Sequence, residues 1–251
     1  MAASQVFSLA GRAAFVTGAA QGLGKAIATG MTQAGARVVL ADLDGRAQPV
    51  ALALRDAGYD ALAVDLDVRD EAMFKCVFES SAASCGGIDV VVNNAASTPS
   101  GSIWDIASSE WDDVMAVNLR GTFFGCRIAG LHMRDRGRGR IVNMASIAGQ
   151  QASPATAAHY AASKGGIVAL TRSFAQLMAP YGVTVNAISP AAIRGPALMS
   201  MDVEVRRDIE NATPLRRFGE DHEVAAAAVY LASDAAAFTT GATLDINGGG
   251  G

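Results

Sequence analysis

A tyrosine and a lysine lie four residues apart in the segment YAASK, Tyr160 to Lys164. This spacing places both side chains on one face of a predicted helix. A free tyrosine has a pKa near 10, so about 0.1% of it is phenolate at pH 7, and lowering its pKa to 7 takes about 4 kcal/mol. A neighbouring ammonium group favours the charged form, so we expect Lys164 to lower the pKa of Tyr160 for general acid–base catalysis. On its own, the pair fits a core tyrosine and a solvated lysine equally well.

A glycine-rich turn, TGAAQGLG at Thr17 to Gly24, follows an apolar run and precedes an amphipathic one. Gly18 allows a tight turn, Gly22 lets the backbone approach a pyrophosphate, and Gly24 lets helix and strand pack closely. The helix N-terminus then presents unpaired N–H groups to phosphates. A purely structural turn is the alternative, but the position between a strand and a helix favours a dinucleotide site.

Asp42 ends the next apolar run, 24 residues after Gly18. A carboxylate there can accept both ribose hydroxyls of an adenosine, whereas a 2′-phosphate would meet like charge. At about 4 Å and an effective dielectric near 20 the repulsion is at most about 4 kcal/mol per unit charge, and a third of it gives roughly tenfold discrimination. We therefore predict NAD over NADP. The alternative is that Asp42 only caps a helix beginning near Asp44.

These residues need an alternation of strands and helices to bring them together. Short β-branched runs alternate with stretches of helical spacing, and crossovers of that length join parallel strands. We expect a single α/β domain over residues 1–251, a doubly wound, Rossmann-like parallel sheet of seven strands with helices on both faces. The predicted strands are 13–17, 37–41, 61–65, 88–93, 140–145, 183–188 and 243–246; predicted helices include 22–34, 70–83, 111–134, 160–180 and 223–233.

The longest interruption of this alternation, residues 191–217, follows the sixth strand. Ligands bind beyond the carboxyl ends of the strands in such folds, so this segment is a candidate substrate lid. A plain surface helix is the alternative.

Composition excludes several classes of protein. Of the 251 residues 51% are hydrophobic and 18% are charged, which suits one large core. The net charge of −4 argues against nucleic-acid binding. The longest apolar run, nine residues, is too short to cross a membrane, and no secretion signal begins the chain, so we expect a cytoplasmic protein. The three cysteines and three histidines have no metal-ligand spacing, so no metal is expected.

The ordered set of motifs resembles the short-chain dehydrogenase/reductase family over nearly the whole chain. The matching pieces are TGAAQGLG at Thr17, Asp67 and Val68, NNAA at Asn93, Asn118 in VNLRG, Ser146 in IVNMASIAG, YAASK at Tyr160, and TGATLDINGGG at Thr240.

The resemblance implies a role for each matching residue. Tyr160 exchanges a proton with the substrate oxygen while a hydride passes to or from the nicotinamide. Ser146 holds that oxygen, Lys164 also binds the nicotinamide ribose, and Asn118 supports a proton relay. The implied NAD contacts are Gly18, Gln21, Gly22, Leu23, Gly24, Asp42, Asp67, Val68, Asn94, Ala95, Tyr160, Lys164, Pro190 and Ile193.

Three positions depart from the family pattern. Ala96 replaces the usual glycine of NNAG, which should be tolerable if its φ is negative. Ala191 replaces the glycine after Pro190, and Gly195 stands where many members carry a threonine, which puts local cofactor contacts in doubt.

The expected reaction is NAD-dependent interconversion of a secondary alcohol and its ketone by a homotetramer. Gln150, Gln151, Ser153, Arg194 and His159 suggest a polyol, sugar or other hydroxylated substrate. One alternative is an NADPH-type 3-oxoacyl or carbonyl reductase, against which Asp42 argues. An alternative from another class is a dinucleotide-sensing protein without turnover.

Overall fold

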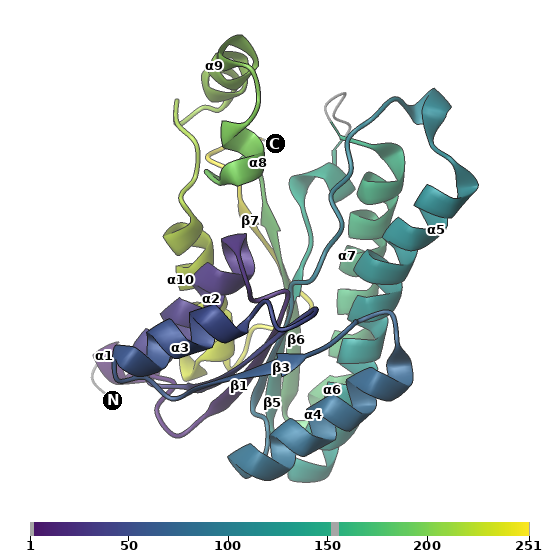
Figure 1. Cartoon of the computed structure of the whole chain (residues 1–251). Helices are drawn as coiled ribbons and strands as arrows, with labels where there is room; N and C mark the ends of the chain where they lie inside the picture. The colour runs from purple at the N-terminus through teal and green to yellow at the C-terminus, as the bar shows by residue number, and fades with distance from the viewer. Residues whose placement is uncertain (1–2, 152–155, 251) are drawn as a thin grey trace.

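The computed structural model describes residues 3–151 and 156–250. Seven parallel strands form one sheet in the order β3-β2-β1-β4-β5-β6-β7, which confirms the predicted doubly wound architecture. Figure 1 shows the sheet seen nearly edge-on between two groups of helices. The strands are β1 (Ala13–Thr17), β2 (Arg37–Asp42), β3 (Ala61–Asp65), β4 (Val90–Asn93), β5 (Gly139–Met144), β6 (Val183–Pro190) and β7 (Thr243–Ile246).

Helices cover both faces because neighbouring strand residues point to opposite sides of a sheet. In β1, Ala14 and Val16 pack with α2 (Gly22–Gln33), α3 (Gln48–Asp56) and α10 (Asp221–Ala232). Ala13 and Phe15 pack instead with α4 (Glu71–Cys85), α6 (Gly121–Arg136) and α7 (Ala158–Met178). Almost every strand residue is therefore apolar, as a parallel sheet covered on both faces requires.

The predicted helix over 111–134 is two helices joined by a π-helical turn. The chain forms α5 (Ser108–Met115), then the wide turn Ala116–Arg120, then α6. The apolar spacing runs through the turn without a proline, so sequence periodicity could not reveal it. Such turns occur often at functional sites, and this one carries Asn118.

Two short helices occupy the interruption after β6, namely α8 (Pro196–Met199) and α9 (Val203–Ala212). In Figure 1 they stand above the sheet, across from α5 and the start of α7. Both ends of the segment are tied together: Ile193 bridges Gly219, whose carbonyl accepts a hydrogen bond from the Arg194 N–H at 2.8 Å. The chain therefore leaves the edge of the sheet and returns to it at nearly the same point.

Within the described residues, every helix is too short or too polar to cross a lipid bilayer.

Candidate active site

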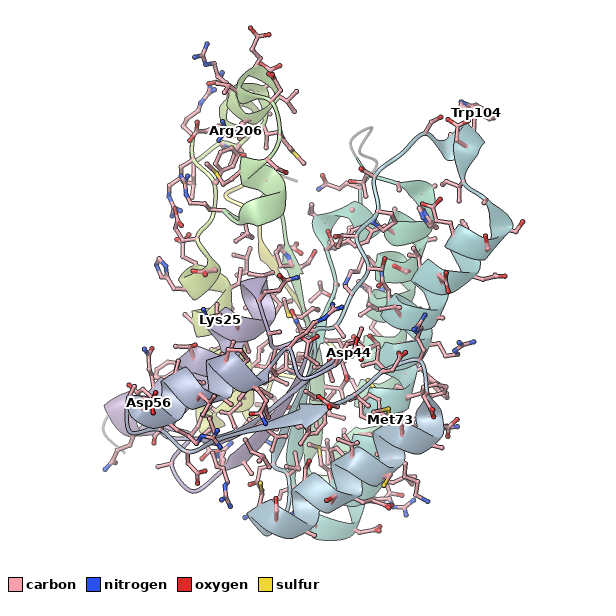
Figure 2. All side chains as sticks on the ribbon, in the orientation of Figure 1. Lys25, Asp44, Asp56, Met73, Trp104 and Arg206 are labelled. Atoms are coloured by element: carbon pink, nitrogen blue, oxygen red, sulfur yellow. The ribbon has the colours of Figure 1, made fainter. Side chains whose placement is uncertain are left out.

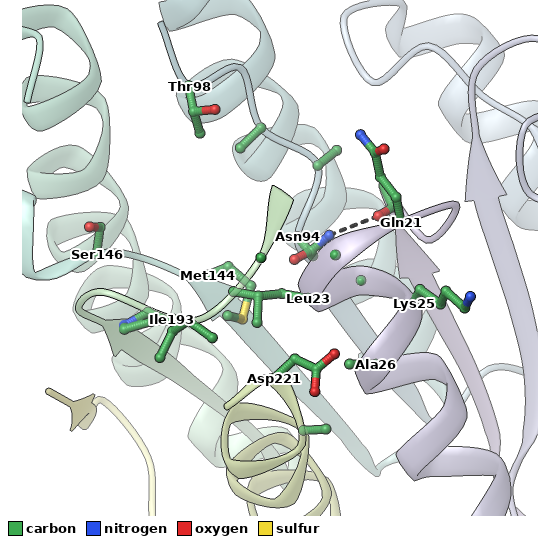
Figure 3. Close-up of a pocket in the computed structure, with 18 of the residues that line it drawn as sticks. Gln21, Leu23, Lys25, Ala26, Asn94, Thr98, Met144, Ser146, Ile193 and Asp221 are labelled. Carbon is green, nitrogen blue, oxygen red and sulfur yellow. Dashed lines mark hydrogen bonds between the residues drawn. The ribbon is translucent and has the colours of Figure 1, made fainter. Parts of the chain in front are cut away.

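A cleft of about 1800 Å³ opens where the strands end. Its walls come from the glycine turn, the ends of β2, β4, β5 and β6, the start of α7, the segment after Pro190, and the facing sides of α2 and α10. Figure 3 shows the glycine turn with Gln21 on one side of this space and Ser146 on the other. The volume exceeds that of a usual small-ligand pocket, so the cleft has room for a dinucleotide and a substrate together.

The glycine turn forms a cradle that side chains would fill. Gly18 has φ 65°, and a Cβ there would lie 2.8 Å from the Cα of Ala95. A Cβ on Gly24 would overlap the carbonyl oxygen of Gly18, whereas Gly22, at φ 52°, faces open space. Gly22 therefore leaves the backbone accessible, while the other two allow close packing. This arrangement fits a bound pyrophosphate.

The start of α2 keeps its N–H groups available. Gln21 occupies the N-cap position without making a side-chain cap, so the N–H groups of the first turn have no side-chain partner. Gln21 and Leu23 both line the cleft. A helix N-terminus of this kind attracts phosphate.

Asn94 braces the turn from the end of β4. Its Nδ2 donates to the carbonyl oxygens of Thr17 (2.9 Å) and Gly18 (3.0 Å), the latter drawn in Figure 3. The hydroxyl of Thr17 accepts hydrogen bonds from the backbone N–H groups of Asn94 and Ala95. The sequence pattern assigns no role to Thr17, although its place directly before Gly18 is a signal for one.

Asp42 lines the cleft at the end of β2. Its carboxylate accepts hydrogen bonds from the backbone N–H groups of Ala20 and Leu43, each at 2.8 Å. The next helix, α3, begins at Gln48 with Ala47 at its N-cap, so the alternative that Asp42 caps this helix is wrong. The charge instead faces the cleft beside the glycine turn.

Asp67 and Val68 line the cleft after β3. Arg69 Nη2 lies 2.7 Å from the Asp67 carboxylate and holds the pKa of that group below its usual range, mainly by hydrogen bonding. The sequence pattern did not single out Arg69, which keeps Asp67 ionised.

Tyr160 and Lys164 share one face at the start of α7, and both line the cleft. The Lys164 Nζ lies 5.5 Å from the centre of the Tyr160 ring and donates to the Met144 carbonyl at 2.6 Å. Burial raises the pKa of Tyr160, although a hydrogen bond with Ser146 acts in the opposite direction. Our prediction that Lys164 lowers the Tyr160 pKa is therefore wrong, because desolvation outweighs the one favourable contact, which comes from Ser146.

Burial also lowers the pKa of Lys164 to about 8. The side chain is 3% exposed, and its ammonium finds a backbone carbonyl but no carboxylate within the described part of the chain. A cation held without a counter-ion costs folding energy, which indicates a role other than stability.

Ser146 and Asn118 lie at the same end of the molecule with different surroundings. Ser146 lines the cleft just after β5. Asn118 is fully buried: its Oδ1 accepts from the Ser97 N–H at 2.7 Å, and its Nδ2 donates to the Ser97 carbonyl and the Ser163 hydroxyl. The Asn118 side chain therefore fixes the loop after β4, with Ser163 as a partner that the sequence did not indicate.

Pro190 and Ile193 line the cleft as β6 ends. Among the described non-glycine residues, only Asp44 and Arg216 have positive φ. Ala96 and Ala191 therefore replace the usual glycines without backbone strain. A Cβ on Gly195 would have no neighbour closer than 4.0 Å, so the missing threonine leaves open space.

Only some of the polar residues predicted to contact the substrate line the cleft. Gln150 turns to the sheet, where its Nε2 donates to Ser189 Oγ (2.7 Å) and Asp245 Oδ1 (2.8 Å). His159 is fully buried, with Nε2 3.2 Å from a Glu110 carboxylate oxygen. Both were expected at the substrate and neither lines the cleft; Ser153 lies outside the described residues. Thr98, Arg194, Leu198 and Met201 line this end.

Comparisons with known proteins find relatives along nearly the whole chain. The family model described as enoyl-(acyl carrier protein) reductase matches residues 18–250. The cis-4-hydroxycyclohexanecarboxylate dehydrogenase of Sinomonas cyclohexanicum is 39% identical over 243 residues, covering 96% of this chain and 97% of the relative. The 3-oxoacyl-(acyl-carrier-protein) reductase FabG of Staphylococcus aureus is 34% identical, covering 95% and 97%.

Solved structures share this fold over nearly the whole chain. A gluconate 5-dehydrogenase from Burkholderia cenocepacia, in complex with NADP and tartrate, superposes with a TM-score of 0.94 at 33% identity. The match covers 99% of this chain and 98% of that one.

Proposed function

The chain belongs to the short-chain dehydrogenase/reductase family of oxidoreductases, and we propose that it interconverts a secondary alcohol and its ketone with NAD. The observation that carries this proposal is one continuous cleft. It has Ser146, Tyr160 and Lys164 at one part of its wall and the glycine turn with Asp42 at another. A dinucleotide bound on the turn would extend toward the tyrosine.

Side chains of the protein transfer the proton. A bound nicotinamide would supply the hydride acceptor for oxidation of the alcohol and the hydride donor for reduction of the ketone. Tyr160 Oη takes the alcohol proton or donates one to the ketone oxygen. Ser146, which lies on the same cleft wall, would orient the same oxygen. Lys164, whose Nζ lies 5.5 Å from the centre of the Tyr160 ring, would bind the nicotinamide ribose.

The raised pKa of Tyr160 suits it to donate a proton at neutral pH. Removal of a proton from an alcohol needs the phenolate, so oxidation should accelerate as the pH rises.

Asp42 supports NAD as the preferred cofactor. Its carboxylate faces the cleft next to Ala20, where a 2′-phosphate would meet like charge. The gluconate 5-dehydrogenase neighbour was solved with NADP, so members of this fold take either cofactor. The charge at position 42 is our reason for assigning NAD here.

We expect Asp42→Asn to lower the ratio of kcat/KM with NAD⁺ to that with NADP⁺ by roughly tenfold or more, because it removes the charge at nearly constant volume. Steady-state kinetics with both cofactors measure this ratio. Asp56→Asn, at the exposed end of α3 and off the cleft wall, is the matched control and should leave it unchanged. Equal efficiency of the wild type with both cofactors would refute the NAD assignment.

A hydroxylated small molecule is the proposed substrate. Two relatives support this class, since their printed names denote enzymes of a hydroxylated ring acid and of gluconate. The FabG relatives favour a second candidate, reduction of a 3-oxoacyl group. A panel of ring alcohols, polyols and sugar acids with NAD⁺, beside a 3-oxoacyl thioester with NADPH, separates the two. No turnover in any arm would favour a dinucleotide-sensing protein.

We also propose a homotetramer. Leu131 on α6 and Leu177 on α7 are 50% and 67% exposed, although both helices have well-packed inner faces. Apolar side chains on adjoining helices favour contact with another subunit. Light scattering coupled to gel filtration should give about four times the 25.7 kDa chain mass, and a monomer mass would overturn the proposal.

A further inference from the structure

Two arginines, of which Arg194 lines the cleft, approach one methionine in the segment after β6. Nη1 of Arg194 lies 3.8 Å from the sulfur of Met199, and Nη1 of Arg206 lies 3.7 Å from the same atom. The two nitrogens are therefore no more than about 7.5 Å apart. Figure 2 places Arg206 on the column formed by α8 and α9, above the sheet. Two guanidinium groups thus meet at an uncharged thioether, a weak acceptor.

The two positive charges are incompletely matched. Among the described residues, no carboxylate lies within ion-pair distance of Arg206, and its Nε is buried without a hydrogen-bond partner. Arg194 has one carboxylate partner, Glu220, which accepts from Nε at 2.9 Å and leaves the outer edge of the guanidinium toward Met199. Arginines brought this close without an anion between them repel each other. An anion at the methionine sulfur would relieve that repulsion.

Arg194 connects this pair to the reaction space. It lines the cleft with Leu198 and Met201, and the cleft continues to Ser146 and Tyr160. Its guanidinium also lies 5.7 Å from the centre of the Phe218 ring, a cation–π contact that helps to orient it. A substrate whose alcohol lies at Tyr160 can therefore extend toward the arginine.

We propose that Arg194 and Arg206 together bind a carboxylate on the substrate, so that the alcohol oxidised by this enzyme is a hydroxy acid. A carboxylate has two acceptor oxygens and can receive a charge-assisted hydrogen bond from each guanidinium. The proposal rests on the proposed function and specifies the substrate class of the same site. It also replaces the polar contacts expected from Gln150 and His159, which are engaged elsewhere.

The pyrophosphate of the dinucleotide is another source of anionic oxygens in this cleft. The substrate is favoured because Arg206 belongs to α9 and lies outside the cleft wall, so an anion that it binds must extend past Arg194, whereas the glycine turn that would hold the pyrophosphate is itself part of that wall. Cofactor and substrate contacts have separate kinetic signatures, so one set of variants distinguishes them.

The test compares an acid with its neutral analogue: cis-4-hydroxycyclohexanecarboxylate and its primary amide, each oxidised with NAD⁺. Arg194→Gln and Arg206→Gln should each lower kcat/KM for the acid roughly tenfold or more. The kcat/KM for the amide and the KM for NAD⁺ should stay within about twofold of their wild-type values. Arg207→Gln, an exposed neighbour on the same helix, is the control and should change neither value.

Two outcomes would overturn the proposal: equal losses for the acid and the amide, or a raised KM for NAD⁺ with an unchanged acid-to-amide ratio. The second would assign the arginines to the pyrophosphate. Calorimetric titration of cyclohexanecarboxylate, which has no hydroxyl, into the protein with NADH separates this inference from the proposed function. Wild-type binding weakened roughly tenfold by Arg206→Gln supports the site even if no alcohol is oxidised; binding unaffected by the substitution overturns it.

Discussion

Tyr160→Phe is expected to lower kcat for alcohol oxidation by about 10²- to 10⁴-fold, the usual contribution of a positioned general acid or base. The substitution removes only the hydroxyl, so the ring keeps its place at the start of α7, beside Lys164 and on the cleft wall. The dissociation constant for NADH should stay nearly constant. Stopped-flow or steady-state absorbance at the NADH band measures the rate, and fluorescence titration measures cofactor binding.

Tyr181→Phe provides the matched control, because that tyrosine is 45% exposed at the far end of α7, away from the cleft. It should retain wild-type activity. A Tyr160→Phe enzyme with more than a few per cent of wild-type kcat would show that another group moves the proton.

Lys164→Met should inactivate the enzyme and stabilise the fold at the same time. Lowering the pKa of a lysine from 10.5 to about 8 reflects a cost to the folded state of about 3 kcal/mol at neutral pH. The variant also loses the hydrogen bond to the Met144 carbonyl, which offsets about 1 kcal/mol of the stability gained by removing the buried charge. The free energy of unfolding should rise by about 2 kcal/mol on these values, while kcat falls at least about 100-fold.

The increase in the free energy of unfolding from Lys164→Met should become smaller as the pH rises. The unfolded lysine keeps its proton up to about pH 10.5, whereas the folded one releases it near pH 8. The penalty in the wild type is therefore complete below pH 8 and fades as the pH rises toward 10.5, so the variant's advantage shrinks over that range. Urea unfolding at pH 7 and pH 9.5 measures both differences. A variant less stable than the wild type at pH 7 would contradict this account of the buried charge.

Much of the architecture could be predicted from local sequence patterns. The strands Ala13–Thr17, Ala61–Asp65 and Thr243–Ile246 lie where the β-branched runs placed them. The glycine turn and Asp42 also lie on the cleft wall as expected. Such features depend on residues close together in the chain, whose conformational preferences are visible in the sequence.

Features set by distant contacts could not be predicted. Gln150 has the polarity of a substrate ligand, but its amide bonds Ser189 and Asp245, the latter 95 positions away. The direction of the Tyr160 pKa depends on how tightly other segments bury the ring. Likewise, the π-helical turn at Asn118 leaves the apolar periodicity intact while it sets the partners of that side chain.

The tie between Ile193 and Gly219 makes the intervening segment an exchangeable module. The carbonyl of Gly219 receives the Arg194 N–H, and the Gly219 N–H donates to Ala192, so the chain leaves and rejoins the body at nearly one point. A segment with adjoining ends can change in length or sequence at little entropic cost to the rest of the fold. Substrate range can thus diversify, in evolution or by grafting, while the dinucleotide turn and the proton-transfer residues stay as they are.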